Sequence, residues 1–219
     1  MAHAILIVTT SHDNMGPGKR TGVWLEEFTS PYEVFRDAGV EIIVASPAGG
    51  DAPIEPRSLP AIDASAHGQA IQALLDTATL ANINPADYDA VFFPGGHGPM
   101  YDLANDDICR KLIATLADSG KVVAAVCHGP AAFTDVTLGN GKSLVDGRRV
   151  TSFLDAEEEQ TGLAGLMPFL LESRLRECGA QFVVAEPWAE NVVTDDRLIT
   201  GQNPASSRAT AQAVLKALG

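Results

Sequence analysis

One cysteine of the sequence stands where a catalytic nucleophile would be placed. Cys127 directly follows the apolar run 122–126, and the residues two positions before and after it, Ala125 and Gly129, are small. A nucleophile elbow needs small residues there, because its tight strand-to-helix turn leaves no room for larger side chains. A helix that begins at Pro130 would add backbone N–H groups and a partial positive charge, which favour thiolate over thiol. The alternative is a small residue packed at the end of a strand.

The other two cysteines, Cys109 and Cys178, fall on apolar helix faces and are expected to be packing residues. An odd and sparse set of three argues against a disulfide framework. The apolar stretch 4–8 follows no positive charge and is too short for a secretory signal. No apolar run approaches the roughly 20 residues of a membrane span. We therefore expect a soluble protein in a reducing, cytoplasmic setting.

A glycine-rich segment, 94–98 (PGGHG), follows a second apolar run. It should leave a strand next to the cysteine strand, so both loops would lie at the carboxyl edge of the sheet, where open α/β sheets bind ligands. Consecutive glycines such as Gly95 and Gly96 let backbone N–H groups point into a site, as in an oxyanion hole. The segment matches neither the P-loop pattern nor the dinucleotide-binding pattern GxGxxG. A simple tight turn is the alternative.

Two acidic segments could contribute to such a site. Glu26 and Glu27 stand early in a predicted helix, where acidic residues are usually solvated and favoured by the helix dipole. Asp155 and the run 157–159 (EEE) follow a predicted strand. A run of like charges is usually a solvated helix face, and we expect one here.

Two histidines complete the candidate set. His128 follows Cys127 directly and would bring an imidazole to the same cleft. Adjacent residues on a turn diverge, so a bond to the sulfur does not follow from the spacing. His97, His128 and one glutamate could together bind a metal, but no ligand-spacing motif supports this, and we predict no metal site.

The elements that would position these residues alternate along the chain. Continuous apolar runs, which are typical of buried parallel strands, predict strands at 4–10, 40–45, 90–94 and 121–126. Helical periodicity predicts helices at 24–38, 68–79, 106–119, 166–178 and 204–218. Further short strands are predicted at 149–153, 181–184, 191–194 and 198–200. This alternation predicts an α/β fold with a doubly wound, mostly parallel, flavodoxin-like sheet sandwiched by helices.

The composition excludes some partners. The 219 residues include 15 basic and 28 acidic side chains, a net charge of −13. This balance argues against nucleic acid, which needs clustered Lys and Arg, and against an anionic membrane surface. No break in composition, repeat or low-complexity tract divides the sequence, so we predict a single domain over residues 1–219.

Taken together, these segments resemble the ThiJ/PfpI superfamily, a branch of the class I glutamine amidotransferase-like fold. The resemblance is greatest to the glutathione-independent glyoxalases and heat-shock chaperone-type proteins. The matching segments are 22–27 with Pro31 and Phe35, 45–50 with Pro56 and Ser58, 88–98, 125–130 and 168–172. They follow the family's order between residues 5 and 203, and the pair PGGHG and AVCHGP is the specific part.

The resemblance implies a role for each candidate. Cys127 matches the family's nucleophile. Glu27 matches a buried glutamate that hydrogen-bonds the cysteine sulfur, which leaves Glu26 as an ordinary surface acid. Because burial and a neighbouring thiolate both disfavour ionisation, we expect a raised pKa for Glu27 and a proton on it.

His128 matches the family's catalytic histidine. Its acidic partner falls in the second acidic run, where the count favours Glu158, with Glu157 and Glu159 as alternatives. The backbone amides of Gly96 and His128 would form the oxyanion hole. Substrate contacts would come from Gly95, His97 and Gly129.

The implied activity is that of a glyoxalase III-type lyase (D-lactate dehydratase type) without glutathione or any cofactor. Methylglyoxal or a similar 2-oxoaldehyde would become a 2-hydroxy acid through a hemithioacetal on Cys127. Glu27 or His128 would move the proton, and loops such as 11–21 would form the pocket wall. The family implies a homodimer. The alternatives are a cysteine amidase or peptidase, a stress chaperone, and a redox sensor whose cysteine is oxidised. Without the extended N-terminal domain and clear metal ligands of larger bacterial chaperone-type members, we expect no strong holdase role.

Overall fold

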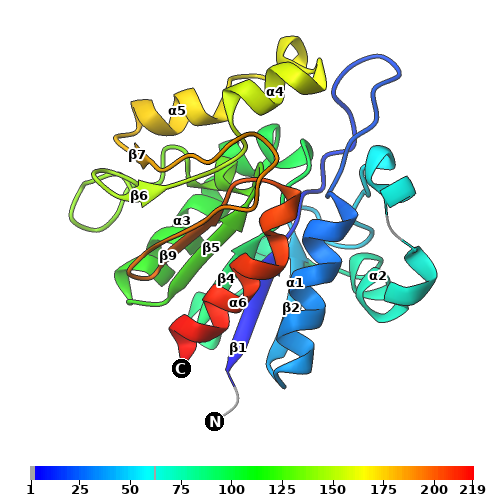
Figure 1. The fold of residues 1–219 in the computed structure, drawn as a ribbon. Coiled ribbons are helices and arrows are strands. Elements are labelled where there is room, and N and C mark those ends of the chain that lie inside the picture. Colours follow the sequence, from blue (N-terminus) through cyan, green and yellow to red (C-terminus); the bar gives the residue numbers. More distant parts are fainter. Residues whose placement is uncertain (1–2, 62) are drawn as a thin grey trace.

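A seven-stranded sheet forms the centre of the computed structural model, which describes residues 3–61 and 63–219 (Figure 1). Its strands, in spatial order, are β3 (Ala78–Thr79), β2 (Glu41–Ser46), β1 (Ala4–Val8), β4 (Ala90–Phe93), β5 (Val122–Val126), β9 (Leu198–Gly201) and β8 (Val192–Asp195). Neighbouring strands are parallel, except that β8 pairs antiparallel with β9. The mostly parallel sheet is thus confirmed, and β4 and β5 are neighbours as predicted.

Helices cover both faces of this sheet, as a doubly wound fold requires. The helices α1 (Leu25–Asp37), α2 (Gly68–Leu74) and α6 (Ser207–Leu218) share one hydrophobic cluster with Ile5 and Ile7. The helices α3 (Asp107–Asp118) and α5 (Leu171–Glu177) share the other with Leu6 and Val8. Successive residues of β1 therefore point into different cores, which explains why its sequence is apolar without alternation. The remaining helix, α4 (Asp155–Thr161), lies beyond the carboxyl edge of the sheet (Figure 1).

Two predicted helices are shorter than their apolar patterns suggested. The predicted helix 68–79 ends at Leu74, and the edge strand β3 follows, because Thr77 and Gly50 exchange backbone hydrogen bonds of 2.8 and 3.0 Å. The predicted helix 166–178 begins only at Leu171. Pro168 explains this, since proline lacks an N–H group and disfavours helical geometry in the residue before it.

The predicted strand 149–153 divides into two parts. Only β6 (Arg149–Val150) is a strand, and it pairs with β7 (Gln181–Phe182) in a separate two-stranded sheet. The chain then crosses the end of β5, where Phe153 donates its N–H to the Cys127 carbonyl at 2.9 Å. This crossing brings α4 over the cysteine. Within residues 3–61 and 63–219, no helix is long and apolar enough to cross a membrane.

Candidate active site

Cys127 occupies a strained turn at the end of β5. Its φ is +59°, a left-handed conformation that residues other than glycine rarely adopt and that concentrates at functional sites. The chain beyond it packs closely on β4, because a Cβ atom on Gly129 would lie 2.1 Å from the Phe93 carbonyl oxygen. The positive φ and this close packing are features that a nucleophile elbow also has, and the small size of Gly129 has a steric reason.

The glycine-rich loop after β4 approaches this turn just as closely. A Cβ atom on Gly95 would lie 2.6 Å from both the His128 nitrogen and a carboxyl oxygen of Glu27. Gly96 has a φ of +88°, and a Cβ atom there would meet the Gly22 carbonyl oxygen at 2.2 Å. The Gly96 N–H lies near the sulfur of Cys127 and lowers the pKa of the thiol. The loop thus presents an amide to the reacting atom, as an oxyanion hole needs.

Glu27 is fully buried in the first turn of α1, while Glu26 is exposed. One carboxyl oxygen, Oε2, accepts a hydrogen bond of 2.7 Å from the Gly95 N–H. The carboxyl group also faces the thiol of Cys127. Burial raises the pKa of Glu27 to about 8, and the nearby Cys127 thiol and the Gly95 N–H offset only part of that rise. Glu27 therefore carries a proton at neutral pH.

Cys127 was expected to favour the thiolate form, but its surroundings favour the protonated thiol. Burial raises its pKa well above the usual value, and the neighbouring Glu27 raises it further. The Gly96 N–H opposes this only in part. The segment that follows is a short 3-10 turn, Gly129–Phe133, rather than the α-helix that was expected to favour the anion. Cys127 is thus a protonated thiol that needs a base before it can react.

His128 supplies a base in the right place. Its Nδ1 lies 3.3 Å from the Cys127 sulfur, and its Nε2 lies 2.6 Å from Glu158 Oε2. Because an ionised carboxylate only accepts hydrogen bonds, Nε2 carries the proton and the Nδ1 lone pair faces the thiol. Burial lowers the pKa of His128 to about 4, aided by His97 and against the effect of Glu158. The imidazole is therefore neutral and able to accept a proton.

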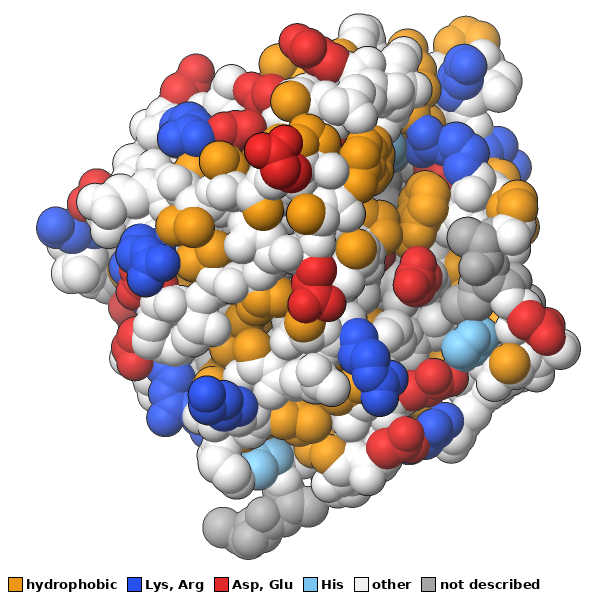
Figure 2. Space-filling model, in the orientation of Figure 1, with side chains coloured by type: hydrophobic (Ala, Val, Ile, Leu, Met, Phe, Trp, Pro, Cys, Tyr) orange, Lys and Arg blue, Asp and Glu red, His pale blue; other side chains and the backbone are white. Residues whose placement is uncertain are grey.

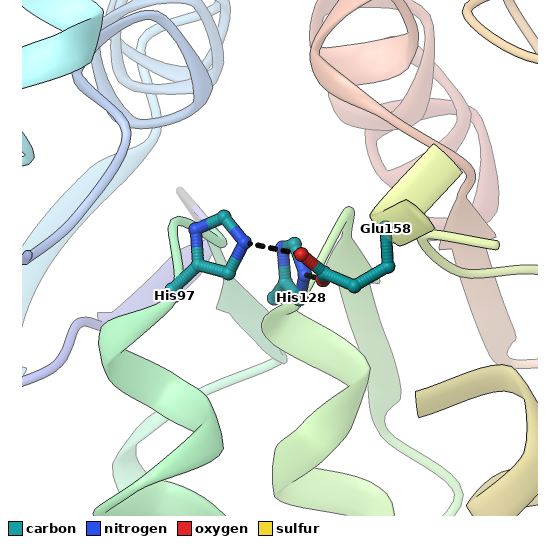
Figure 3. A group of neighbouring side chains, drawn as sticks. All are labelled: His97, His128 and Glu158. Atoms are coloured by element: carbon teal, nitrogen blue, oxygen red, sulfur yellow. Dashed lines mark hydrogen bonds and ion pairs between the residues drawn. The ribbon is translucent and has the colours of Figure 1, made fainter. Parts of the chain in front are cut away.

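Glu158 is the acidic partner of both histidines. Its two oxygens contact His128 Nε2 at 2.6 Å and His97 Nε2 at 3.0 Å (Figure 3). Burial alone would raise the pKa of Glu158, but the hydrogen bonds from the two imidazoles outweigh it and hold the pKa well below its usual range. Glu159 is exposed, whereas Glu157 is buried and makes other contacts. The expected solvated face was thus wrong for Glu157 and Glu158.

The contacts continue outward from His97 to an ion pair between the exposed Arg57 and the buried Glu55. His97 Nδ1 accepts from Arg57 Nη2 at 2.9 Å, since an arginine can only donate. Arg57 in turn donates to both oxygens of the fully buried Glu55, each at 2.9 Å. This fixes the proton of His97 on Nε2, facing Glu158. The sequence reasoning missed this extension, because Arg57 lies far from the glycine loop and carries no local signal.

With this geometry in view, the chain can be compared with known proteins. Residues 20–217 match the DJ-1/PfpI family. The chain belongs to this family. It is 34% identical to Glyoxalase 3 of Candida albicans, over 97% of each chain. It is also 34% identical to a glutathione-independent glyoxalase of Schizosaccharomyces pombe, over 97% of this chain and 94% of that one. The crystal structure of glyoxalase III from Candida albicans is similar with a TM-score of 0.90 at 33% identity, covering 98% of this chain and 97% of that one.

A metal could in principle occupy this DJ-1/PfpI site. One ligand atom each from His97, His128 and Glu158 lies within 4.8 Å of the others. Zinc needs nitrogen ligands at about 2.0–2.1 Å with free lone pairs. Here the same nitrogen atoms donate to the carboxylate, so an ion would have to replace both hydrogen bonds. A metal-free site stays a prediction.

A cavity of about 110 Å³ opens beside the sulfur, large enough for a small molecule. It is lined by Trp24, Arg57, Gly96, His97, Cys127, His128, Phe153, Thr161, Trp188 and Pro204. Of the predicted substrate contacts, His97 lies on this wall, whereas Gly95 and Gly129 are not among the lining residues and serve the close loop packing described above. Figure 2 shows acidic and basic side chains spread over this face, with several basic ones close together at the upper right.

The cavity wall differs from the one expected. Residues of loop 11–21 were expected to form it, but Met15, Gly18, Lys19 and Arg20 border a neighbouring cavity of about 330 Å³ instead. The wall near the catalytic candidates is aromatic, because Phe153 and Trp188 contribute to it. Trp188 was missed in the sequence, where it lies about 60 residues beyond Cys127 without any motif around it.

Proposed function

We propose that this chain is a glutathione-independent glyoxalase that converts methylglyoxal or a related 2-oxoaldehyde to a 2-hydroxy acid through Cys127. One observation carries the proposal. The Cys127 sulfur lies between a neutral imidazole that can take a proton and a buried carboxyl group that can give one. Isomerising a 2-oxoaldehyde requires both functions. The names of the curated relatives support the same activity.

The first step forms a hemithioacetal. His128 Nδ1 removes the thiol proton as the sulfur attacks the aldehyde carbon, and the carbonyl electron pair moves to oxygen. The Gly96 and His128 amides stabilise that oxygen until it is protonated. Glu158 remains ionised and holds the resulting imidazolium in position.

The second step moves hydrogen between the two carbons. A base, His128 or Glu27, removes the proton from the former aldehyde carbon to give an enediol, and a proton returns to the neighbouring carbon. The aldehyde carbon is oxidised and the ketone carbon is reduced, so no external oxidant is needed. The product is a thioester of the 2-hydroxy acid, which water hydrolyses to release the acid and the free thiol.

The direct experiment measures lactate formed from methylglyoxal without glutathione. Wild-type protein should form lactate, and Cys127→Ala should lose this activity. Cys178→Ala, at a half-buried free cysteine outside the site, is the matched control and should keep it. Unchanged lactate formation in Cys127→Ala would overturn the proposal. A substrate adduct located on Cys127 by mass spectrometry would support it.

The strained turn at Cys127 also favours a second candidate, a cysteine amidase or peptidase. The same thiol, imidazole and amides could serve acyl transfer to water. Release of amine from amides or peptides, with no turnover of 2-oxoaldehydes, would favour it. On the family resemblance, we also propose that the protein is a homodimer in the cytoplasm. Light scattering of the purified protein would measure the mass of the assembly.

A further inference from the structure

A second buried carboxylate lies next to Glu158 on α4 and has no part in the proposed reaction. Glu157 is fully buried, and in the described part of the chain no lysine, arginine or histidine pairs with it. Its Oε2 accepts from the Leu154 N–H at 2.9 Å. Its Oε1 accepts from Trp188 N at 2.7 Å, Asn203 Nδ2 at 2.8 Å and Gln202 Nε2 at 3.2 Å. Four donors thus compensate for the burial of this group.

One of these donors belongs to the aromatic wall of the catalytic cavity. Trp188 has a φ of +66°, which costs energy for a bulky residue and persists only where its surroundings fix it. The backbone N–H of Trp188 donates to Glu157 Oε1, and its indole N–H donates to Gln160 Oε1 at 2.6 Å. Both acceptors lie on α4, the helix that also carries Glu158.

The Trp188 ring is placed between solvent and the reacting groups. The residue is 46% exposed, and its ring meets the Phe153 ring edge-on with 5.4 Å between centroids. Phe153 in turn packs against the His128 imidazole at 4.3 Å. Trp188 therefore closes one side of the cavity without touching the histidine itself.

We propose that Trp188 limits the size of the substituent that the site accepts beside the reacting carbonyl groups, and that Glu157 is the positioning residue that holds Trp188 there. This inference rests on the proposed glyoxalase function and names its substrate class, 2-oxoaldehydes with a small apolar substituent such as methyl. The indole stands in the wall of this cavity of about 110 Å³, so a phenyl substituent should meet it where a methyl group would not. Even one methylene group changes selectivity in an apolar pocket by about tenfold or more.

The test compares kcat/KM for methylglyoxal and phenylglyoxal. Trp188→Ala should raise the ratio of phenylglyoxal to methylglyoxal by about tenfold or more, and Trp188→Phe should change it less. Glu157→Ala should shift the ratio in the same direction, because it leaves the Trp188 N–H without its acceptor. Glu159→Ala, at the exposed neighbour, is the matched control and should leave the ratio unchanged. Thermal melting would verify that each variant is folded.

The outcomes separate the two parts of the inference. An equal fall for both substrates in Trp188→Ala would overturn the size limit. Wild-type selectivity in folded Glu157→Ala would overturn its positioning role, since mere destabilisation lowers both rates together.

A second readout does not depend on turnover. The alkylation rates of Cys127 by iodoacetamide and by the bulkier N-phenyl iodoacetamide, followed by peptide mass, should differ strongly in wild-type protein and less in Trp188→Ala. If neither oxoaldehyde is converted but this difference is found, the proposed function fails and the size limit stands. If wild type and Trp188→Ala discriminate equally between the reagents, the size limit fails.

Discussion

The two sides of Cys127 each carry a buried carboxyl group, but the pKa values of the two groups move in opposite directions. On the α1 side, the pKa of Glu27 rises to about 8. On the α4 side, the pKa of Glu158 falls well below its usual range. Burial acts against ionisation in both. The difference lies in the donors, because Glu27 accepts from the Gly95 backbone N–H, whereas Glu158 accepts from two imidazole N–H groups and shares the Thr161 hydroxyl.

This contrast divides the chemistry between the two sides. A carboxyl group that stays protonated at neutral pH can donate a proton, and one that stays ionised can hold an imidazolium. A single thiol therefore has an acid on one side and an oriented base on the other. The two roles can be tested separately, because each carboxyl group has an exposed glutamate beside it in the sequence that serves as a control.

The largest expected effect is on the α4 side. Glu158→Gln removes the negative charge that stabilises the His128 imidazolium formed when the imidazole takes the thiol proton. We expect kcat/KM for methylglyoxal to fall by about a thousandfold. Glu159→Gln, one residue further and exposed, should change it by less than about twofold. Near-wild-type activity in Glu158→Gln would show that the imidazole needs no anionic partner.

The second prediction concerns stability and the α1 side. Unfolded Glu27 ionises near pH 4.5, while the folded group keeps its proton until about pH 8. The stabilising contribution is therefore complete below pH 4.5 and is lost progressively as the pH rises from 4.5 to about 8, by about 5 kcal/mol in all.

Urea unfolding of wild type and Glu27→Gln over this range would measure the contribution. The difference between their free energies of unfolding should fall with rising pH, and other titrating groups, including His128, cancel in it. A pH-independent difference would mean that Glu27 is already ionised in the folded protein.

The same variant gives the third prediction, on activity. Glutamine matches the shape of a protonated glutamate and can still accept from the Gly95 N–H, so the thiol should stay in place. It cannot donate a proton and take it back, and we expect kcat to fall by about a hundredfold with little change in KM. Glu26→Gln is the control and should be active. Full activity in Glu27→Gln would reduce the role of Glu27 to hydrogen bonding.

The sequence patterns predicted the thiol and the glycine loop better than the two carboxyl groups beside them. Cys127 and the glycine loop follow apolar strands, so short-range patterns were enough to place them at one sheet edge. The doubly wound fold follows likewise from strands that are apolar on both faces, although the two-residue strand β3 has too little pattern to be seen. Glu27 and Glu158 were singled out only by the family resemblance, because an acidic residue near a helix start usually faces water.

The acidic run on α4 shows why the rest could not be predicted. Nothing within the run distinguishes a buried glutamate from an exposed one. Glu157 is buried because its donors come from residues 188, 202 and 203, and Glu158 because its donors come from residues 97 and 128. Such partners are set by the packing of distant segments. The same holds for Trp188 in the cavity wall.

The smallest expected effect tests whether each hydrogen-bond donor contributes separately to keeping Glu158 ionised. Thr161 Oγ1 lies 2.9 Å from Glu158 Oε1 and 2.7 Å from the Glu158 carbonyl oxygen, so its single proton is shared between them. Thr161→Val keeps the shape but removes this donor, and it also leaves the Leu163 N–H without its acceptor. We expect a loss of about 1 kcal/mol in stability and a fall of about three- to tenfold in kcat/KM. Thr161→Ser retains the hydroxyl and should recover most of both. If Thr161→Val were as inactive as Glu158→Gln, the ionised state of Glu158 would depend on this hydroxyl rather than on the two imidazoles, and the contrast with Glu27 would have a different cause.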